Sequence, residues 1–312
     1  MGLLVDGKWV DQWYDTKASG GRFKRKDSSF RSWIKADGST PHAPESGRYH
    51  LYVSYACPWA HRTLIYRRLK GLEDHISVSV VNPIMLEHGW TFEPGDGVVP
   101  DPFHSADVLH PVYTAATVDY SGRVTVPVLW DRQYATIVSN ESAEIIRMFD
   151  QEFGGMTGRP AAYRPADLVD EIDALNERIY SGFNNGVYKA GFASSQEAYD
   201  EAVAGVFEML DRLEARLADL RRRQANGELS AEELAELEEL AGLDERKELN
   251  ELEELDEADD PPPLPESTST DTKYKLMANF GSDHGRLRIW MKAKNAPGLG
   301  EGKPDALTGS KD

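Results

Sequence analysis

The 312-residue chain is poor in cysteine, in long apolar runs and in clustered positive charge, and each shortage excludes a class of protein. Cys57 is the only cysteine, so an intramolecular disulfide framework is excluded and a reducing compartment is expected. No early apolar run resembles a signal peptide, and no stretch approaches the roughly 20 apolar residues of a membrane span. The composition therefore predicts a soluble, cytoplasmic protein without a membrane partner.

The acidic balance of the chain is local. The formal net charge is −18, of which the segment from Glu228 to Asp260 carries −14 and the remainder −4. Because no basic stripe is left to neutralise phosphates, we expect no nucleic-acid partner. The histidines lack metal-ligand spacing and no glycine-rich phosphate loop is present, so the sequence predicts no metal site.

Cys57 has a setting that suits a reactive thiol. A strand-like apolar run at 49–54 precedes it, Pro58 follows at the expected first helical position, and a helical pattern runs from Ala60 to Leu69. At such a strand-to-helix turn, the free N–H groups and the positive end of the helix favour thiolate over thiol. A small buried apolar residue is the alternative interpretation of this cysteine.

The elements around this cysteine follow the order β-α-β, loop, β-β-α. The expected segments are strands at 49–54, 75–81, 123–130 and 135–138, helices at 58–70 and 140–149, and an irregular loop at 83–122. Asn140 or Ser139 is the expected N-cap of the second helix. This order predicts an α/β, thioredoxin-like domain with the cysteine at the start of its first helix.

The rest of the chain divides by composition. Helical spacing predicts helices at about 165–182 and 195–222, whereas the leucines after residue 228 step by three, which favours an isolated helix or disorder over a coiled coil. The predicted ranges are 1–48, an extended arm that packs by its aromatic side chains; 49–155, the thioredoxin-like domain; 156–224, a partial helical domain; 225–272, an acidic stretch and proline linker; and 273–312, a tail with a β-hairpin at 274–280 and 286–291.

Five segments together resemble a known family. They are Cys57-Pro58-Trp59-Ala60, Trp90 with the five residues before it, the run from Tyr120 to Asp131, Asn140-Glu141-Ser142, and the run from Asn185 to Ala193. From about residue 3 to about 220 the chain resembles the glutathionyl-hydroquinone reductases, the Xi class of glutathione transferases. The resemblance implies a glutathione-transferase-type all-α domain after the thioredoxin-like domain, glutathione as co-substrate, and a homodimer.

Two of these segments have a clear chemical use. Glu141 and Ser142 at a helix N-terminus offer a carboxylate to an ammonium group, and N–H groups and a hydroxyl to a carboxylate, which are the charges of a γ-glutamyl end. Ordinary capping is the alternative. Val126-Pro127 suits a sheet edge or a cis turn. The resemblance implies a cis proline that leaves the Val126 backbone free to pair with the cysteine of glutathione.

The resemblance assigns further site residues. It places the strand of Arg123, Val124 and Thr125 against glutathione, makes Trp90 a flat wall over the ligand, and makes Tyr188 the acid/base. Without the resemblance, Arg123 would be interpreted as a surface charge, and Trp90 could be either a core residue or a wall over the ligand. Tyr188 is expected between helices, in a stretch bordered by Gly and Asn. We interpret His61, one turn after the cysteine, as part of a solvated helix face.

The implied reaction is thiolate displacement on a glutathionylated aromatic small molecule. Cys57 attacks the sulfur, Tyr188 supplies a proton to the leaving hydroquinone, and a second glutathione resolves the Cys57–glutathione mixed disulfide. Two alternatives stay open: a broader thiol-type transferase acting on mixed disulfides, and a non-catalytic module of the same fold. Past Leu220 the chain departs from the family, which predicts an incomplete helical domain, exposed apolar helix faces and impaired activity.

Overall fold

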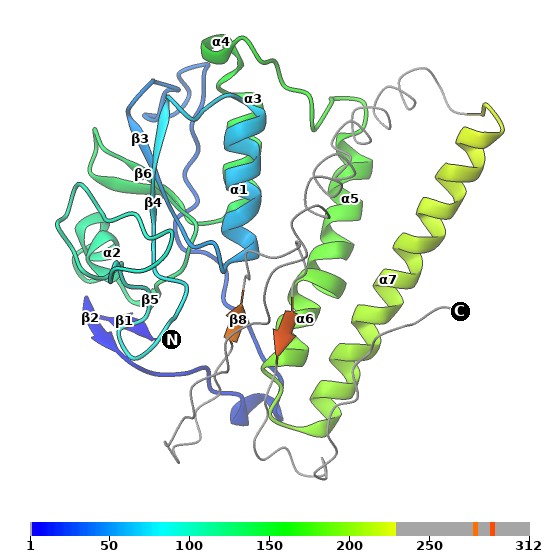
Figure 1. Ribbon diagram of the computed structural model, residues 1–312, viewed down its shortest axis with the longest axis horizontal. Helices are drawn as coiled ribbons and strands as arrows, with labels where there is room; N and C mark the ends of the chain where they lie inside the picture. The colour runs from blue at the N-terminus through cyan, green and yellow to red at the C-terminus, as the bar shows by residue number, and fades with distance from the viewer. Residues whose placement is uncertain (1, 229–276, 280–287, 291–312) are drawn as a thin grey trace, which may run out of the picture. The chain divides into compact units, whose positions relative to one another are not determined.

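The computed structural model describes residues 2–228, 277–279 and 288–290 (Figure 1). They fall into two compact units. The first unit contains the described residues up to Asp15 and Lys24–Asn176, and the second contains Thr16–Phe23 and the described residues from Glu177 onward. Most of the acidic stretch and the proline linker lie outside the described residues. No helix within the described ranges is long and apolar enough to cross a membrane.

The first unit is built on a four-stranded sheet in the order β4-β3-β6-β7. Its strands are β3 (Tyr49–Val53), β4 (Ile76–Val80), β6 (Val128–Asp131) and β7 (Thr136–Ser139). β3 is parallel to β4, through the crossover helix α1 (Pro58–Leu69), and antiparallel to β6. Every residue of β3 is buried, as expected for a strand that is covered on both faces.

Helices cover both faces of this sheet. Figure 1 shows α1 and α3 (Ser142–Gln151) on one side and the short helix α2 (His110–Ala116) on the other, and the one-turn helix α4 (Gly154–Thr157) follows α3. The thioredoxin-like domain is therefore confirmed. The prediction that 83–122 is irregular throughout is wrong, because α2 lies within it.

The predicted strand at 123–130 is divided. β5 (Gly122–Arg123) joins a separate sheet with β1 (Leu3–Val5) and β2 (Lys8–Val10), whereas β6 belongs to the main sheet. The peptide bond Val126–Pro127 lies between them and is cis. Proline has no N–H to donate to a ladder, which favours a break in the strand at this position.

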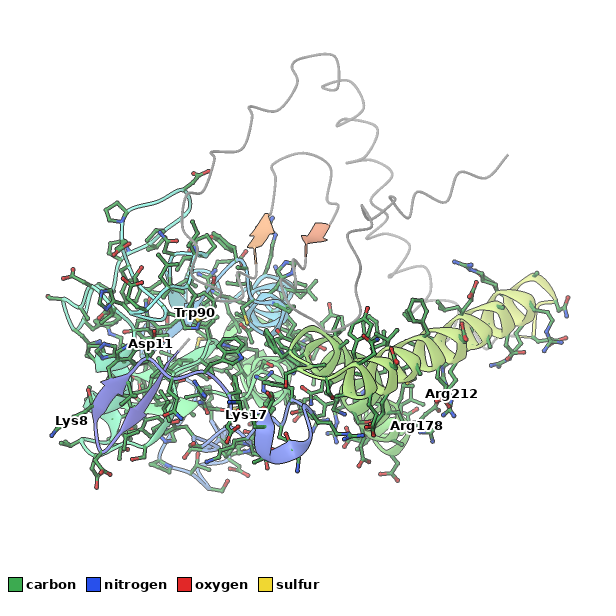
Figure 2. The ribbon with its side chains drawn as sticks, turned by 90° about the horizontal axis from the view of Figure 1, so that it is seen from below. Lys8, Asp11, Lys17, Trp90, Arg178 and Arg212 are labelled. Atoms are coloured by element: carbon green, nitrogen blue, oxygen red, sulfur yellow. The ribbon has the colours of Figure 1, made fainter. Side chains whose placement is uncertain are left out.

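The N-terminal arm is a hairpin at its start. The turn between β1 and β2 is Asp6-Gly7, with φ of 47° and 73°, and a Cβ at Gly7 would lie 2.2 Å from the Val118 carbonyl oxygen. Figure 2 shows Lys8 on this hairpin. Trp9 stacks on His110, which agrees with packing by an aromatic anchor, and residues 3–10 fold back as a hairpin of two extended strands. The Asp-Gly turn signal was present in the sequence.

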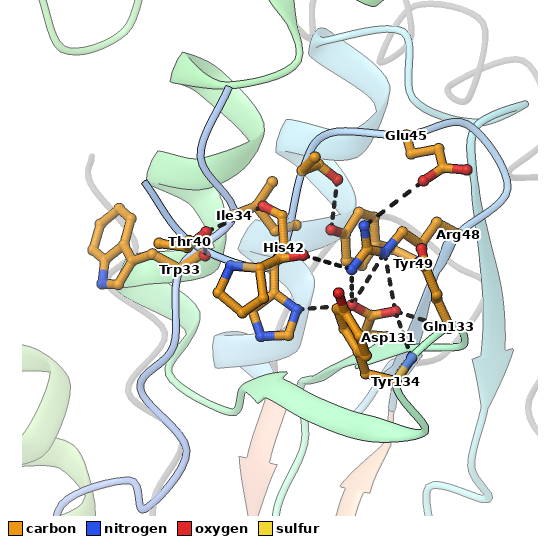
Figure 3. Close-up of polar contacts among 12 residues, drawn as sticks. Trp33, Ile34, Thr40, His42, Glu45, Arg48, Tyr49, Asp131, Gln133 and Tyr134 are labelled. Atoms are coloured by element: carbon orange, nitrogen blue, oxygen red, sulfur yellow. Dashed lines mark hydrogen bonds and ion pairs between the residues drawn. The ribbon is translucent and has the colours of Figure 1, made fainter. Parts of the chain in front are cut away.

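A buried charge cluster fastens the later part of the arm to β6 (Figure 3). Asp131 is fully buried and accepts hydrogen bonds from Arg48 Nη2 at 2.6 Å, and its Oδ2 lies 2.7 Å from His42 Nδ1. The Arg48 guanidinium also lies over the ring of Tyr134. Each charged group is paired, as burial requires, so the cluster is structural.

The second unit is helical. Its elements are the 3₁₀ turn η1 (Lys17–Ser19), the end of α5 (Val169–Ile179), the π-helical segment η2 (Tyr180–Asn184), α6 (Asn185–Gly191) and α7 (Gln196–Ala225). α6 and α7 pack against each other. A Cβ at Gly186 would lie 2.7 Å from Val206 Cγ2, so glycine allows this close approach. The predicted apolar exposure is found on α7, at Phe207 and Leu217.

At the far end of the chain, β8 (Met277–Asn279) and β9 (Arg288–Trp290) pair antiparallel. This pairing agrees with the hairpin predicted for the tail. The remainder of that predicted hairpin lies outside the described residues.

Candidate functional site

Cys57 lies at the junction that the sequence predicted. It is the N-cap of α1, with extended backbone angles and Pro58 at the first helical position. Its side chain is partly exposed, and its Sγ donates to the carbonyl oxygen of Val126 at 3.5 Å. The thiol therefore faces the residue that precedes the cis proline.

The electrostatic surroundings of the thiol act in opposite directions. Burial raises the pKa of Cys57, whereas hydrogen bonds from the backbone N–H groups of Ala60 and Trp59 and the charges of Arg25 and Arg62 lower it. The net direction is upward. The expectation of a lowered pKa is therefore wrong, because desolvation of the thiolate outweighs the helix N-terminus.

The backbone just before the cis proline is hydrogen-bonded to the side chain of Tyr113. The Tyr113 hydroxyl donates to the Thr125 carbonyl oxygen at 2.8 Å and accepts from the Thr125 N–H at 3.1 Å. Val124 and Val126 are buried. Within residues 2–228, the Val126 N–H has no hydrogen-bond partner. The backbone beside the thiol is thus rigidly placed and keeps a donor.

Glu141 and Ser142 open α3, but not as predicted. Glu141 itself is the N-cap, and its Oε1 accepts from the Ala143 N–H at 3.1 Å, so the expectation of Asn140 or Ser139 as N-cap is wrong. The Asn140 side chain is used elsewhere: Oδ1 accepts from the Phe30 N–H at 3.1 Å and Nδ2 donates to the Tyr113 hydroxyl at 3.3 Å. Asn140 therefore links the arm, the Tyr113 support and the start of α3.

Arg62 connects the cysteine with this helix start. Its Nε and Nη2 donate to Ser142 Oγ at 3.0 and 2.7 Å, and its Nη2 lies 3.7 Å from Glu141 Oε1. Its guanidinium also lies over the ring of Trp59, 5.0 Å from the centroid. The sequence interpretation weighed the neighbouring His61, whose exposed side chain agrees with a solvated face, and overlooked Arg62.

Trp90 and Arg123, two of the predicted site residues, make contacts with other residues of the first unit. Trp90 is 9% exposed and belongs to the hydrophobic core, which is the alternative that the sequence left open (Figure 2). The Arg123 guanidinium donates to the Gln12 carbonyl and lies 4.1 Å from the ring centroid of Tyr14. Burial lowers the pKa of Arg123.

Tyr188 belongs to the second unit. It lies on α6, not between helices, and its ring is 5.9 Å from that of Phe192. Gly186, which borders the stretch around Tyr188, instead faces α7, where an added Cβ would meet Val206. Of the predicted residues of the first unit, Val126 contacts Cys57, and Glu141 and Ser142 are reached from α1 through Arg62, whereas Tyr188 belongs to the second unit.

The fold and this site define a thioredoxin-like thiol domain of the glutathione transferase type. Residues 56–152 match the glutathione S-transferase N-terminal domain. The chain is 57% identical over 233 residues to the glutathionyl-hydroquinone reductase YqjG of Escherichia coli K12, covering 72% of this chain and 71% of that protein. It is 55% identical over 217 residues to the glutathionyl-hydroquinone reductase PcpF of Sphingobium chlorophenolicum, covering 70% and 68%.

Solved structures agree. The glutathione-bound structure of YqjG has a TM-score of 0.61 at 53% identity, covering 70% of this chain and 67% of that chain. A Xi-class glutathione transferase from Natrialba magadii has a TM-score of 0.64 at 48% identity, covering 70% and 66%. The chain belongs to the glutathionyl-hydroquinone reductases, the Xi class of glutathione transferases. The matched region spans between 66% and 71% of the length of these relatives.

Proposed function

We propose that this protein is a glutathione-dependent reductase that removes glutathione from glutathionyl-hydroquinones. The observation that carries the proposal is the contact between the Cys57 thiol, at the start of α1, and the carbonyl of Val126, before the cis proline. A glutathione whose cysteine pairs with the Val126 backbone would have its sulfur beside Cys57. The Val126 N–H is a donor for that pairing.

The γ-glutamyl end has its own subsite in the proposal. Glu141 binds the ammonium group, and the hydroxyl and helix N-terminus at Ser142 bind the carboxylate. In the proposal, Val124 and Thr125 line the peptide, and Trp90 and Arg123 contact the ligand. For Arg123 to contact glutathione, it must leave Gln12 and Tyr14, which now hold it.

The proposed chemistry is a two-step thiol exchange. The Cys57 thiolate attacks the glutathionyl sulfur, the carbon–sulfur bond breaks toward the ring, and Tyr188 protonates that carbon to release the hydroquinone. A second glutathione thiolate attacks the resulting mixed disulfide, which releases oxidised glutathione and restores Cys57. The two electrons that reduce the conjugate come from the two sulfurs that end as a disulfide.

Two variants test this proposal. Cys57→Ser should abolish hydroquinone release from a glutathionylated hydroquinone, because no other thiol is present in the chain. Tyr188→Phe should slow release by about 10²-fold, the typical contribution of a positioned acid. Chromatography of the released hydroquinone measures both, with Arg68→Gln, an exposed change on α1, as the matched control.

Mass spectrometry supplies an independent readout. After exposure to oxidised glutathione, the protein should carry one glutathione adduct, located on Cys57. Full turnover by the serine variant would refute the proposal. Turnover on glutathionylated peptide thiols but not on the hydroquinone conjugate would replace it with a broader thiol-type transferase, and glutathione binding without any turnover with a non-catalytic module.

A further inference from the structure

Arg62 lies between the Cys57 end of α1 and the Glu141-Ser142 pair at the start of α3. The Arg62 side chain extends from α1, the helix whose N-cap is Cys57. Its guanidinium donates two hydrogen bonds to Ser142 Oγ at the start of α3. Ser142 is buried, and an acceptor hydroxyl in that position still has its own hydrogen to donate. The arginine thus fixes the direction in which the Ser142 O–H can point.

The pairing of Arg62 with Glu141 is loose. Their closest atoms are 3.7 Å apart, while the Glu141 oxygens take their shorter bonds from the Ala143 N–H and the Ser28 hydroxyl, both at 3.1 Å. Glu141 is therefore held mainly by its cap and by the arm. A planar guanidinium is well suited to a carboxylate, which it can bind through two parallel hydrogen bonds.

The same cation acts on the nucleophile. Arg62 and Arg25 both stabilise the charged form of Cys57 and so lower the pKa of its thiol against the effect of burial. Both guanidiniums lie over the ring of Trp59, at 5.0 and 5.1 Å from the centroid. Trp59 follows Cys57 by two residues, so the cations are gathered at the α1 N-terminus.

We propose that Arg62 is the positioning residue that joins the γ-glutamyl subsite to the cysteine. Its fork orients Ser142 and adds a positive charge for the γ-glutamyl carboxylate of glutathione, and that charge also stabilises the Cys57 thiolate. The inference rests on the proposed function, because it takes glutathione as the ligand.

Arg62→Gln and Arg62→Lys separate the two roles. The glutamine variant removes the charge and the fork, so the KM for glutathione should rise about tenfold, as for a lost charged hydrogen bond. Its rate of Cys57 alkylation by iodoacetamide near neutral pH should fall several-fold, with the pH profile displaced upward. The lysine variant keeps the charge but not the fork. It should restore the alkylation profile and leave the KM raised.

Arg68→Gln is the control, because Arg68 lies on the same helix with its side chain 85% exposed and pairs with Glu73. It should change neither readout. A glutamine variant with the wild-type KM and alkylation profile would overturn the inference. If that variant does not fold, the lysine variant decides: a raised KM with a normal profile supports the inference, and an unchanged KM overturns it.

The alkylation readout separates this inference from the proposed function. Alkylation requires no turnover, and glutathione binding to the wild-type protein is measurable by calorimetry. A wild-type protein that binds glutathione without turnover would defeat the reductase proposal, while a weaker binding by Arg62→Gln would still support the role of Arg62.

Discussion

His50 shows how one buried side chain makes stability depend on pH. It lies on β3 and is 1% exposed, and its ring nitrogens lie 2.7 Å from the Ser77 hydroxyl and 2.9 Å from the Ser79 hydroxyl. Burial lowers its pKa from 6.5 to about 4. The folded protein therefore holds this ring neutral at pH values where the unfolded chain protonates it.

The sign of the effect follows from proton uptake. Above pH 6.5 the ring is neutral in both states; as the pH falls from 6.5 toward 4, the unfolded chain binds the proton first and the folded state loses stability. We expect a loss of about 2 kcal/mol by pH 5 from this residue. Urea unfolding between pH 7.5 and 5 measures it.

The matched variants are His50→Asn and His61→Asn. The first should flatten the pH dependence of the unfolding free energy, and the second, on the exposed face of α1, should leave it as it is. An undiminished slope in His50→Asn would show that other groups carry the effect.

The local sequence pattern predicted the residues at the starts of helices. It did not predict the residues whose side chains connect one helix or strand with another. Cys57 and the Glu141-Ser142 pair follow from strand-to-helix junctions that can be read in the sequence. Arg62 and Asn140 act across 80 and 110 residues of chain, on Ser142 and Phe30, and periodicity carries no information at that distance. The raised pKa of the thiol also depends on burial, which only the packed structure gives.

The contact between α6 and α7 requires glycine at one position and not at another. Gly186 faces Val206, whose Cγ2 would be 2.7 Å from an added Cβ, whereas an added Cβ at Gly205 on α7 meets nothing within 4 Å. Both residues are helical, so both would gain helix propensity from alanine. Only the first would also crowd the interface.

Gly205→Ala should therefore stabilise the second unit by about 0.5–1 kcal/mol. Gly186→Ala should destabilise it by about 1 kcal/mol, because overpacking costs more than propensity returns. Amide hydrogen exchange along α7 measures both. In the Gly186→Ala background, Val206→Ala should recover protection; if it does not, steric conflict with Val206 is not the cause.

The bounds of some helices and strands could be predicted from the sequence, and those of others could not. β3, β4, α1 and α7 have strong patterns, and their predicted bounds were within about three residues. The expectation that Tyr188 lies between helices was wrong, because Gly186 allows the close approach of α7 and does not form a turn. The split of the 123–130 strand depends on its partners, β1 in one sheet and β3 in the other, which are distant in sequence.

The two units differ in how much apolar surface they bury. The first has a continuous core that includes fully buried Tyr49, Leu51, Val128 and Phe149. In the second, the buried residues of α7 are Ala198, Ala202 and Met209, and no buried residue follows on this helix up to Ala225. Its second half, with Leu210 and Leu217 exposed, therefore has little packing to support it.

This difference predicts a gradient of local stability along the chain. Isolated helices of about 15 residues are marginal in water, so the amides of residues 212–225 should exchange with solvent close to the unprotected rate. Amides of β3 and β6 should be protected to near the global unfolding free energy, since both strands are buried and paired. Exchange followed by mass spectrometry resolves the two segments, and the first half of α7, from Gln196 to Met209, serves as the internal comparison. Equal protection in both halves of α7 would mean that something beyond the described contacts covers the second half, and Leu217→Ser would then identify whether its exposed apolar face is the surface in use.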